Sequence, residues 1–232
     1  MSINFDNFNS VVSLFNHQCK ELKDSPYLWR KVEGKYLSLS WLEIQKKVNA
    51  LAKGLLSLGI LKGDRIVILS ENRPEWQIAD LAIMSIGGIT VPAYTTSTTS
   101  DYKHIINHSE ARCIIVSSND LALKAIPATL NSKCKNVILI DEDKKKFDEP
   151  LYFTNWNDLI EQNNNSKNDN DLDENIKSQK RTDTACIIYT SGTGGSPKGV
   201  MLSHGAMLTN CSGAQELLKN LISDLSEIRF LS

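Results

Sequence analysis

The sequence lacks the cysteine pattern of a disulfide-stabilised protein. Its five cysteines are scattered and odd in number, and no C-x-x-C pair occurs among Cys19, Cys113, Cys134, Cys186 and Cys211. Such spacing argues against a disulfide framework and indicates reduced thiols in a cytoplasmic protein. We expect Cys186 and Cys211 to act as small apolar groups in the interior.

A strong net charge and a long hydrophobic run are also absent. The 26 basic and 27 acidic residues give a formal net charge of −1, so the composition offers no sign of a nucleic-acid-binding surface. Residues 81–93 are the longest uncharged apolar stretch, but they include Gly87, Gly88 and Pro92 and are too few to span a bilayer. The first ten residues contain no apolar h-region, so we expect no targeting segment. A peripheral contact with the inner face of the membrane stays open.

Length and composition permit one large or two small domains, because 232 residues with 41% hydrophobic content can form a real core. Short apolar runs alternate with segments of helical apolar spacing between residues 40 and 141. We expect strands at 65–69, 89–94, 113–116 and 136–140, and helices at 40–58, 74–86, 101–108 and 119–130. This alternation predicts an α/β fold with a doubly wound, mostly parallel sheet flanked by helices.

Two further regions follow the sheet layer at 40–141. Residues 142–184 are predicted to be a linker, because residues 162–180 are rich in asparagine, aspartate, lysine and serine and indicate a disordered or loosely ordered surface loop. Residues 185–232 contain apolar strand-like runs at 185–189 and 200–202, a helical segment at 205–218 and the start of another strand at 228–231.

The most informative segment lies between the first two of these runs. Residues 189–204 are Y-T-S-G-T-G-G-S-P-K-G-V-M-L-S-H, rich in glycine, threonine and serine around Lys198. Glycines let the backbone turn tightly so that its N–H groups converge on an anion, hydroxyls add donors, and lysine adds positive charge. The segment therefore predicts a strand–loop–strand cradle for a polyphosphate.

Two other interpretations of this loop are weaker. A Walker A loop requires a hydroxyl residue after its lysine and a helix beyond it, whereas Gly199 follows Lys198 and an apolar, strand-like run comes next. A plain glycine- and serine-rich linker does not account for a P-K-G sequence tightly flanked by apolar runs.

Two histidines raise the separate question of a metal site. His104 and His108 have the i, i+4 spacing of a zinc-binding pair, but no glutamate follows His104 and no third ligand is evident. We therefore interpret both as structural histidines at the surface.

The glycine-rich loop resembles the signature T-S-G-[ST]-T-G-x-P-K-G of the AMP-forming acyl-adenylate synthetases, with Gly194 in place of a second threonine or serine. In that superfamily the loop holds the β- and γ-phosphates of ATP. The resemblance implies that Thr190, Ser191 and Thr193 donate from their hydroxyls and that Lys198 is catalytic and offsets phosphate charge. The implied nucleotide-binding residues are Thr190, Ser191, Gly192, Thr193, Gly194, Gly195, Ser196, Lys198, Gly199 and His204.

The rest of the chain resembles one branch of the superfamily. The segments L-S-L-S-W-L-E-I, E-N-R-P-E-W and D-L-A-I-M-S-I-G-G-I-T-V-P-A-Y-T-T-S-T are similar to the N-terminal part of a bacterial-type long-chain fatty acid–CoA ligase. One departure is Ala206, where family members often have asparagine. The resemblance makes residues 1–232 a partial AMP-binding domain, with the phosphate-loop segment at 185–232, and the remainder of the ligase chain its partner.

The implied reaction converts a fatty acid to acyl-AMP with ATP and then to acyl-CoA with CoA, with Mg²⁺ bridging phosphate oxygens. No magnesium ligand can be named from the sequence, and we expect the chain to be inactive by itself. Two alternatives stay open: an adenylate-forming ligase for another acid, such as an aryl or amino acid, and a non-catalytic remnant that serves as an interaction module.

Overall fold

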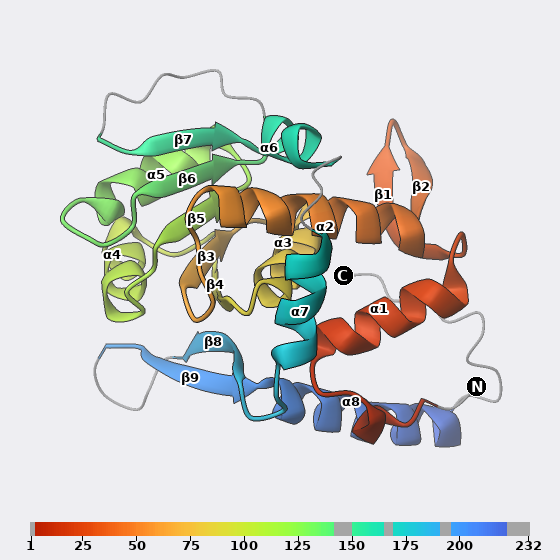
Figure 1. Ribbon diagram of the computed structural model, residues 1–232. Coiled ribbons are helices and arrows are strands. Elements are labelled where there is room, and N and C mark those ends of the chain that lie inside the picture. The colour runs from red at the N-terminus through yellow and green to blue at the C-terminus, as the bar shows by residue number, and fades with distance from the viewer. Residues whose placement is uncertain (1–2, 142–149, 165–168, 191–195, 222–232) are drawn as a thin grey trace.

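The computed structural model describes residues 3–141, 150–164, 169–190 and 196–221 (Figure 1). The strands are β1 Pro26–Val32, β2 Lys35–Ser40, β3 Arg65–Leu69, β4 Ile89–Ala93, β5 Cys113–Val116, β6 Asn136–Leu139, β7 Tyr152–Asn155, β8 Thr184–Thr190 and β9 Lys198–Ser203. The helices are η1 Phe5–Asn7, α1 Val11–Leu22, α2 Trp41–Ser57, α3 Pro74–Ser85, α4 Thr99–His108, α5 Asn119–Thr129, α6 Trp156–Asn163, α7 Asp169–Ser178 and α8 His204–Leu221.

Seven of the described strands form one sheet in the order β7-β6-β5-β3-β4-β8-β9. Every neighbouring pair is parallel except β8 and β9, which form an antiparallel pair at one edge. The strands β1 and β2 form a separate antiparallel hairpin that projects away from the sheet (Figure 1). The predicted doubly wound, mostly parallel α/β fold is therefore confirmed.

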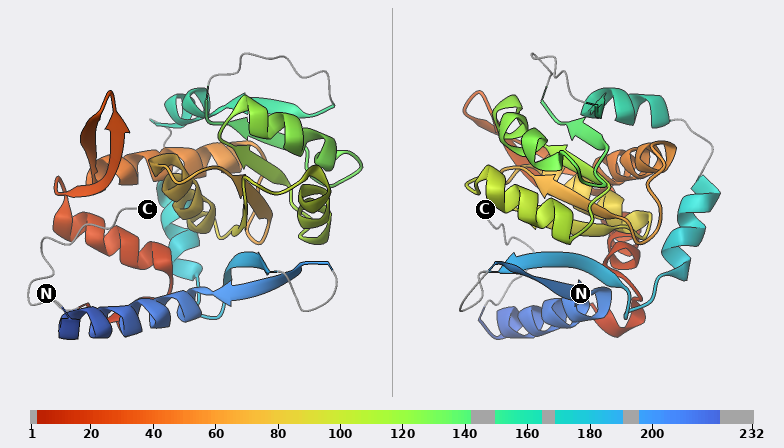
Figure 2. Two further views of the ribbon diagram at one scale, coloured as in Figure 1. Left: turned by 180° about the vertical axis from the view of Figure 1, so that it is seen from behind. Right: turned by 90° about the vertical axis from the view of Figure 1, so that its left-hand side faces the viewer.

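Helices cover both faces of the sheet, as the two views in Figure 2 show. On β3, Ile66 and Ile68 belong to a core cluster shared with α1, α2, α3, α6 and α7, whereas Val67 and Leu69 belong to the cluster beneath α4 and α5. Successive strand residues point to opposite faces, so a strand that is apolar at every position is buried on both. This arrangement is the one that the unalternating apolar runs predict.

Local sequence signals determine the ends of α2. The Ser40 side chain accepts a hydrogen bond from the Glu43 backbone, and the Glu43 carboxylate accepts one from the Ser40 N–H, which is a capping box. At the other end Gly59 has a positive φ of 78°, and the Ile60 N–H donates to the Leu55 carbonyl. The helix predicted at residues 40–58 is confirmed to within one residue at each end.

The expectation of a loosely ordered loop at 162–180 is wrong over α7. Leu172 and Ile176 are four residues apart and enter the core cluster formed with α1, α2 and α3. The side-chain amide of Gln179 donates to the Met84 carbonyl at 2.6 Å and ties the end of this segment to α3. Two apolar residues on one helical face suffice here because the opposite face meets water.

Other sequence expectations differ in smaller ways. Residues 142–184 contribute β7 and α6, so they extend the sheet, although the predicted boundaries of that region stay a prediction. Cys186 is buried as expected, but Cys211 is exposed. The strand expected at 228–231 lies outside the described residues. Among the helices that the structure describes, none has the length and apolar character that crossing a bilayer requires.

Candidate functional site

The loops after β3 and β4, together with the end of β8, enclose a cavity of about 610 Å³. Its lining residues are Ser70, Glu71, Asn72, Trp76, Pro92, Ala93, Tyr94, Thr95, Ile188 and Tyr189. In doubly wound sheets, ligands bind at the carboxyl ends of the strands where the strand order reverses, which here is at β3, between β4 and β5. The cavity occupies this edge, and β8 carries the start of the glycine-rich loop to it.

The antiparallel pair β8 and β9 brings the two ends of the glycine-rich loop side by side. In their register Thr190 lies opposite Lys198, and both side chains are exposed. Ser196 is also exposed and comes two residues before Lys198. The expected loop residues Ser191, Gly192, Thr193, Gly194 and Gly195 lie outside the described residues. The predicted strands on both sides of the loop are confirmed, and they place one hydroxyl and one ammonium group across from each other.

Gly199 allows the neighbouring strand to lie close to β9. A Cβ atom at this position would lie 2.7 Å from Cγ2 of Ile187 and 3.3 Å from Cζ of Tyr189. Both distances are shorter than ordinary van der Waals contact between carbon atoms. The glycine next to Lys198 is therefore needed for the packing of the hairpin, whether or not its backbone also contacts an anion.

His104 and His108, one turn apart on α4, contact the stem of the same hairpin. Nε2 of His104 lies 2.8 Å from the Pro197 carbonyl oxygen, and Nδ1 of His108 lies 2.8 Å from the Tyr189 hydroxyl. The sequence interpretation as structural histidines did not include these contacts. The i, i+4 spacing shows that the two rings share a helix face, but their partners lie 93 and 81 residues away along the chain.

Tyr189 is the central group of this cluster. The residue is 7% exposed, and its ring is nearly perpendicular to both imidazoles, at centroid distances of 5.9 Å from His104 and 5.6 Å from His108. Burial raises the pKa of the Tyr189 phenol, so the hydroxyl keeps its proton at neutral pH. A protonated phenol can both donate and accept, which lets it bond to His108 in either tautomer of that ring.

His204 occupies the other end of β9. Its ring is 1% exposed, and Nδ1 accepts from the Val11 N–H at 3.4 Å, while its backbone N–H donates to the Asp183 carbonyl at 3.0 Å. Burial lowers the pKa of His204, which favours the neutral ring. It follows Lys198 by six positions, so the two residues are on the order of 20 Å apart along β9. The structure gives His204 a packing role, and its part in nucleotide binding stays a prediction.

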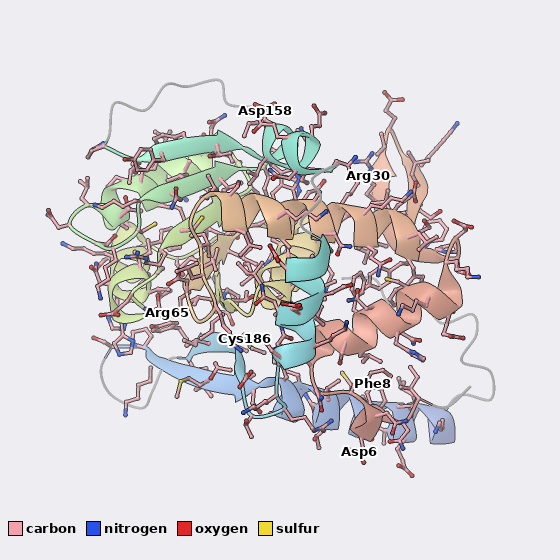
Figure 3. All side chains as sticks on the ribbon, viewed as in Figure 1. Asp6, Phe8, Arg30, Arg65, Asp158 and Cys186 are labelled. Atoms are coloured by element: carbon pink, nitrogen blue, oxygen red, sulfur yellow. The ribbon has the colours of Figure 1, made fainter. Side chains whose placement is uncertain are left out.

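The N-terminal segment covers the region around His204. Arg181 donates from Nη1 to the carbonyls of Phe5 and Phe8, at 3.0 Å and 2.9 Å, and forms an ion pair with Asp6. Asp6 and Phe8 lie beside α8 (Figure 3). These contacts tie the start of the chain to the turn before β8. The N-terminal segment therefore covers the His204 ring, which lies away from the end of β9 that holds Lys198.

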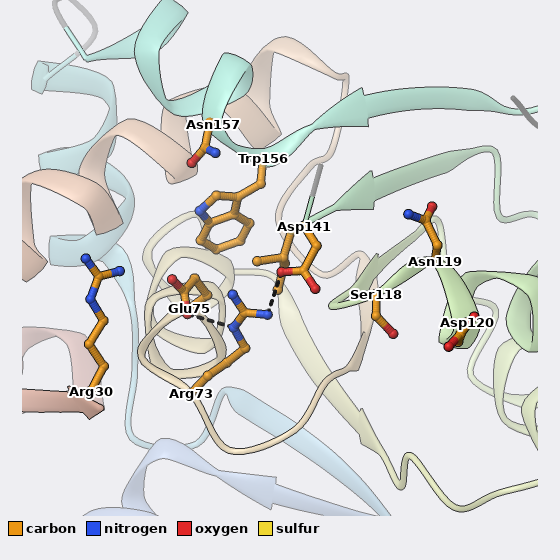
Figure 4. Close-up of a pocket in the computed structure, with 10 residues that line it drawn as sticks. Arg30, Arg73, Glu75, Ser118, Asn119, Asp120, Asp141, Trp156 and Asn157 are labelled. Atoms are coloured by element: carbon orange, nitrogen blue, oxygen red, sulfur yellow. Dashed lines mark hydrogen bonds and ion pairs between the residues drawn. The ribbon is translucent and has the colours of Figure 1, made fainter. Parts of the chain in front are cut away.

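A second cavity of about 630 Å³ lies at the carboxyl ends of β5 and β6 (Figure 4). One of its two arginines, Arg73, is neutralised by two ion pairs, from Nε to Glu75 at 2.8 Å and from Nη1 to Asp141 at 2.9 Å; the other is Arg30. A guanidinium held between two carboxylates has little remaining attraction for an anionic ligand. The glycine-rich loop begins beside the first cavity, which Ile188 and Tyr189 line, so we place the functional site there, next to the hairpin.

The described residues do not assemble a metal centre. They contain no group of three or more histidine, cysteine, aspartate or glutamate side chains placed to hold an ion. His104 and His108 are stacked with ring centroids 5.3 Å apart, and one nitrogen of each is engaged by the hairpin. The zinc pair that their spacing suggested is not formed by these rings.

Comparison with known protein families gives one match over most of the chain. The model of the family described as AMP-binding enzyme matches residues 15–227.

Similar curated proteins are long-chain-fatty-acid–CoA ligases. One from Mycobacterium tuberculosis is 28% identical over 89% of this chain and 33% of its own length, and one from Mus musculus is 32% identical over 92% of this chain and 32% of its own. The chain thus spans about a third of the length of the curated relatives it matches.

Two solved structures with the same fold are CoA ligases. A long-chain-fatty-acid-CoA ligase from Archaeoglobus fulgidus has a TM-score of 0.71 at 21% identity and covers 90% of this chain and 38% of its own. An anthranilate CoA ligase in complex with anthranoyl-AMP has a TM-score of 0.70 at 20% identity and covers 87% of this chain and 36% of its own. At these identities the likeness concerns the fold.

Proposed function

This chain belongs to the AMP-binding enzyme family, and from that premise we propose that it supplies the polyphosphate-binding part of an ATP-dependent long-chain fatty acid–CoA ligase. The observation that carries the proposal is the β8–β9 register, which sets Thr190 opposite Lys198 beside the cavity at the sheet edge. A hydroxyl and an ammonium group across from each other can donate to neighbouring oxygens of one phosphate chain. The long-chain acid is proposed because the curated relatives named above are ligases for such acids.

The proposed reaction has two halves. A carboxylate oxygen of the acid attacks the α-phosphorus of ATP, the bond from that phosphorus to the bridging oxygen breaks, and pyrophosphate leaves with the electron pair. The sulfur of CoA then attacks the acyl carbon of the acyl-AMP, AMP leaves with its oxygen, and the thiol gives up its proton. Negative charge builds up on the departing pyrophosphate in the first half, which is where donors fixed in advance lower the barrier most.

Each described loop residue has a role in this proposal. Lys198 offsets the charge of the β- and γ-phosphates and of the departing pyrophosphate, and the Thr190 and Ser196 hydroxyls donate to phosphate oxygens. The same role is proposed for the hydroxyls of Ser191 and Thr193. Gly199 keeps β9 close to β8, so that the lysine is held opposite Thr190.

Magnesium would neutralise part of the phosphate charge in such a reaction. The carboxylate that lines the cavity belongs to Glu71, and it already accepts a hydrogen bond of 2.5 Å from the Ser117 hydroxyl. With no cluster of metal ligands among the described residues, the side chains do not fit a complete magnesium site. No step of the proposal is therefore routed through the metal.

We also propose that the protein acts in the cytoplasm. Its five cysteines are free, and four of them are buried. Free thiols persist in reducing compartments, where ATP and CoA are also available as substrates.

The proposal is tested by titrating residues 1–232 with pyrophosphate and with ATP in a calorimeter. Both ligands should bind, and Lys198→Ala should weaken binding about 10- to 100-fold, because a hydrogen bond from a charged group contributes about 1.5–3 kcal/mol. Lys177→Ala, at an exposed lysine of α7, is the control and should bind like the unchanged chain. Absence of binding, or equal loss in the two variants, would contradict the proposal.

The identity of the acid substrate requires a separate assay, on a ligase that contains this chain and is as long as the curated relatives. ATP–pyrophosphate exchange should depend on a long-chain fatty acid, and Lys198→Ala should lower it. The fold of an anthranilate CoA ligase is equally similar to this chain, so an aryl acid is the comparison substrate. Exchange with the aryl acid alone would replace the fatty-acid assignment, and exchange with neither would favour a non-catalytic interaction module.

A further inference from the structure

Two histidines of α4 hold both ends of the glycine-rich loop. His104 contacts the carbonyl of Pro197, which directly precedes Lys198, and His108 contacts the hydroxyl of Tyr189, which directly precedes Thr190. Both nitrogen–oxygen distances are 2.8 Å, within the normal range of a hydrogen bond. The two residues that we propose to bind phosphate are therefore each one peptide bond away from a tethered residue.

The helix that carries these histidines is itself firmly placed. Thr98 and Asp101 form a capping box at its start, and Tyr102, Ile105 and Ile106 anchor its opposite face in the core. His104 and His108 stand on the remaining face, where their rings stack with an interplanar angle of 26°. A donor mounted on such a helix loses little conformational freedom when it bonds to the loop.

The chemistry of the His104 contact determines the position of one proton. A carbonyl oxygen only accepts hydrogen bonds, so Nε2 of His104 must carry hydrogen in this contact. The contact with Tyr189 has no such requirement, because the hydroxyl can donate to Nδ1 of His108 or accept from it. His104 is thus a dedicated donor to the backbone that leads into Lys198.

The β-ladder does not supply this restraint. The register of β8 with β9 ends at Thr190 and Lys198, so the Pro197 carbonyl lies beyond the last paired residues. Proline has no N–H, and it can join no ladder as a donor at this point. His104 therefore adds a hydrogen bond to the residue directly before Lys198, where the ladder of the described strands has ended.

We propose that His104 and His108 are positioning residues that fix Lys198 and Thr190 in the arrangement that receives a polyphosphate, a role that rests on the proposed function of the loop. Neither ring needs to touch the ligand. Their contribution is to remove loop conformations in which the ammonium and the hydroxyl point apart, which lowers the entropy lost on binding.

The test uses variants of residues 1–232 that keep or remove single donor atoms. In His104→Gln the amide nitrogen reaches about as far as Nε2 and can still donate to Pro197, whereas His104→Leu is similar in size and cannot donate. His108→Asn and His108→Leu form the same pair for Nδ1, and Tyr189→Phe removes the hydroxyl alone. His17→Leu, at an exposed histidine of α1, is the control.

Two measurements separate the role of the histidines from the function of the loop. The first is amide hydrogen exchange of β8 and β9 without ligand, in which His104→Leu should exchange faster while His104→Gln and His17→Leu match the unchanged chain. The second is pyrophosphate binding by calorimetry, which should weaken about five- to tenfold in His104→Leu and recover in His104→Gln, as expected for one neutral hydrogen bond.

Each outcome decides one of the two questions. Unchanged exchange in both leucine variants and in Tyr189→Phe, or equal behaviour of glutamine and leucine at position 104, would overturn the positioning role. Faster exchange with undiminished pyrophosphate binding would also overturn it. Faster exchange in a chain that binds no pyrophosphate at all would support the tether and refute the proposed function of the loop.

Discussion

Gly199 is in contact with two side chains of the neighbouring strand, and this contact explains its identity at the residue scale. Gly199→Ala should destabilise the protein by about 1–3 kcal/mol, because the new methyl group would overlap Cγ2 of Ile187 at 2.7 Å. Urea unfolding measures the loss. Gly213→Ala on α8 is the matched control, since a Cβ there meets no atom within 4 Å and alanine favours a helix.

A second variant tests the cause of that loss. Ile187→Ala removes the methyl group that the new Cβ would meet, so Gly199→Ala should cost less in that background than in the unchanged chain. Equal costs in both backgrounds would show that backbone conformation, and not this contact, accounts for the glycine.

Asp80 makes the stability of the protein depend on pH. Burial raises the pKa of its carboxyl from the ordinary 3.8 to about 6. The folded state then binds the proton more tightly than the unfolded state. The stabilising effect of protonation is fully present below pH 3.8 and is lost as the pH rises through about 6.

Asp80→Asn should therefore stabilise the protein at pH 7.5, by about 1–3 kcal/mol, and have a smaller effect at pH 4.5. Urea unfolding of both proteins at the two pH values gives the comparison, in which the contributions of other groups cancel. Asp24→Asn, at an exposed aspartate, is the matched surface control. An equal effect of Asp80→Asn at both pH values would mean that this carboxyl does not titrate between them.

At this scale the sequence points to some residues of the proposed site and misses others for a physical reason. Lys198 and Thr190 were predicted because the chemistry of their loop is contained in adjacent residues. His104 and His108 were not connected to the loop, because their hydrogen bonds join segments 93 and 81 residues apart. A contact between distant segments leaves no periodic pattern in a single sequence.

At the scale of elements, α7 is a helix that the sequence did not predict. Leu172 is 2% exposed and packs into the cluster shared with α2, so Leu172→Ala should destabilise the protein by about 2–4 kcal/mol. Leu123→Ala, at a leucine of α5 that is 45% exposed, should cost less than about 1 kcal/mol. Urea unfolding distinguishes the two, and similar small losses would contradict the packing of α7.

The difference between predicted and missed elements follows from how each is stabilised. The strands β3, β5 and β6 are apolar at successive positions because both of their faces are buried, and such runs are visible in the sequence. In contrast, α7 keeps one narrow apolar stripe among polar residues, and β7 is a four-residue edge strand with Tyr152 exposed. Elements that are only partly buried need few apolar residues, so their sequences resemble those of loops.

At the scale of the whole molecule, the position of the glycine-rich loop depends on strand order. The chain passes from β7 at one edge of the sheet to β8 beyond β4, and only this crossing brings Thr190 to the carboxyl ends of β3 and β4. Alternating elements predict a parallel sheet, but they do not give its order, because several orders satisfy the same handedness. The motif was therefore predictable, whereas the cavity next to it was not.

The charges around the cavity lead to a prediction for the whole molecule: residues 1–232 bind a polyphosphate but do not form acyl-AMP. Among the residues that line the cavity in the described part of the chain, Glu71 alone is charged, and it is negative. Adenylation must bring the carboxylate of the acid to the α-phosphate of ATP. These two anions repel each other and the Glu71 carboxylate, so they are not held at reacting distance without further cations. Curated relatives are about three times as long as this chain, and their additional length is available to supply such groups.

Mass spectrometry of reactions with ATP and palmitate should detect no palmitoyl-AMP, under conditions in which a full-length relative forms it. Sustained palmitoyl-AMP formation by residues 1–232 would show that the described cavity is sufficient for the chemistry, and that Lys198 and its loop neighbours neutralise the charge unaided.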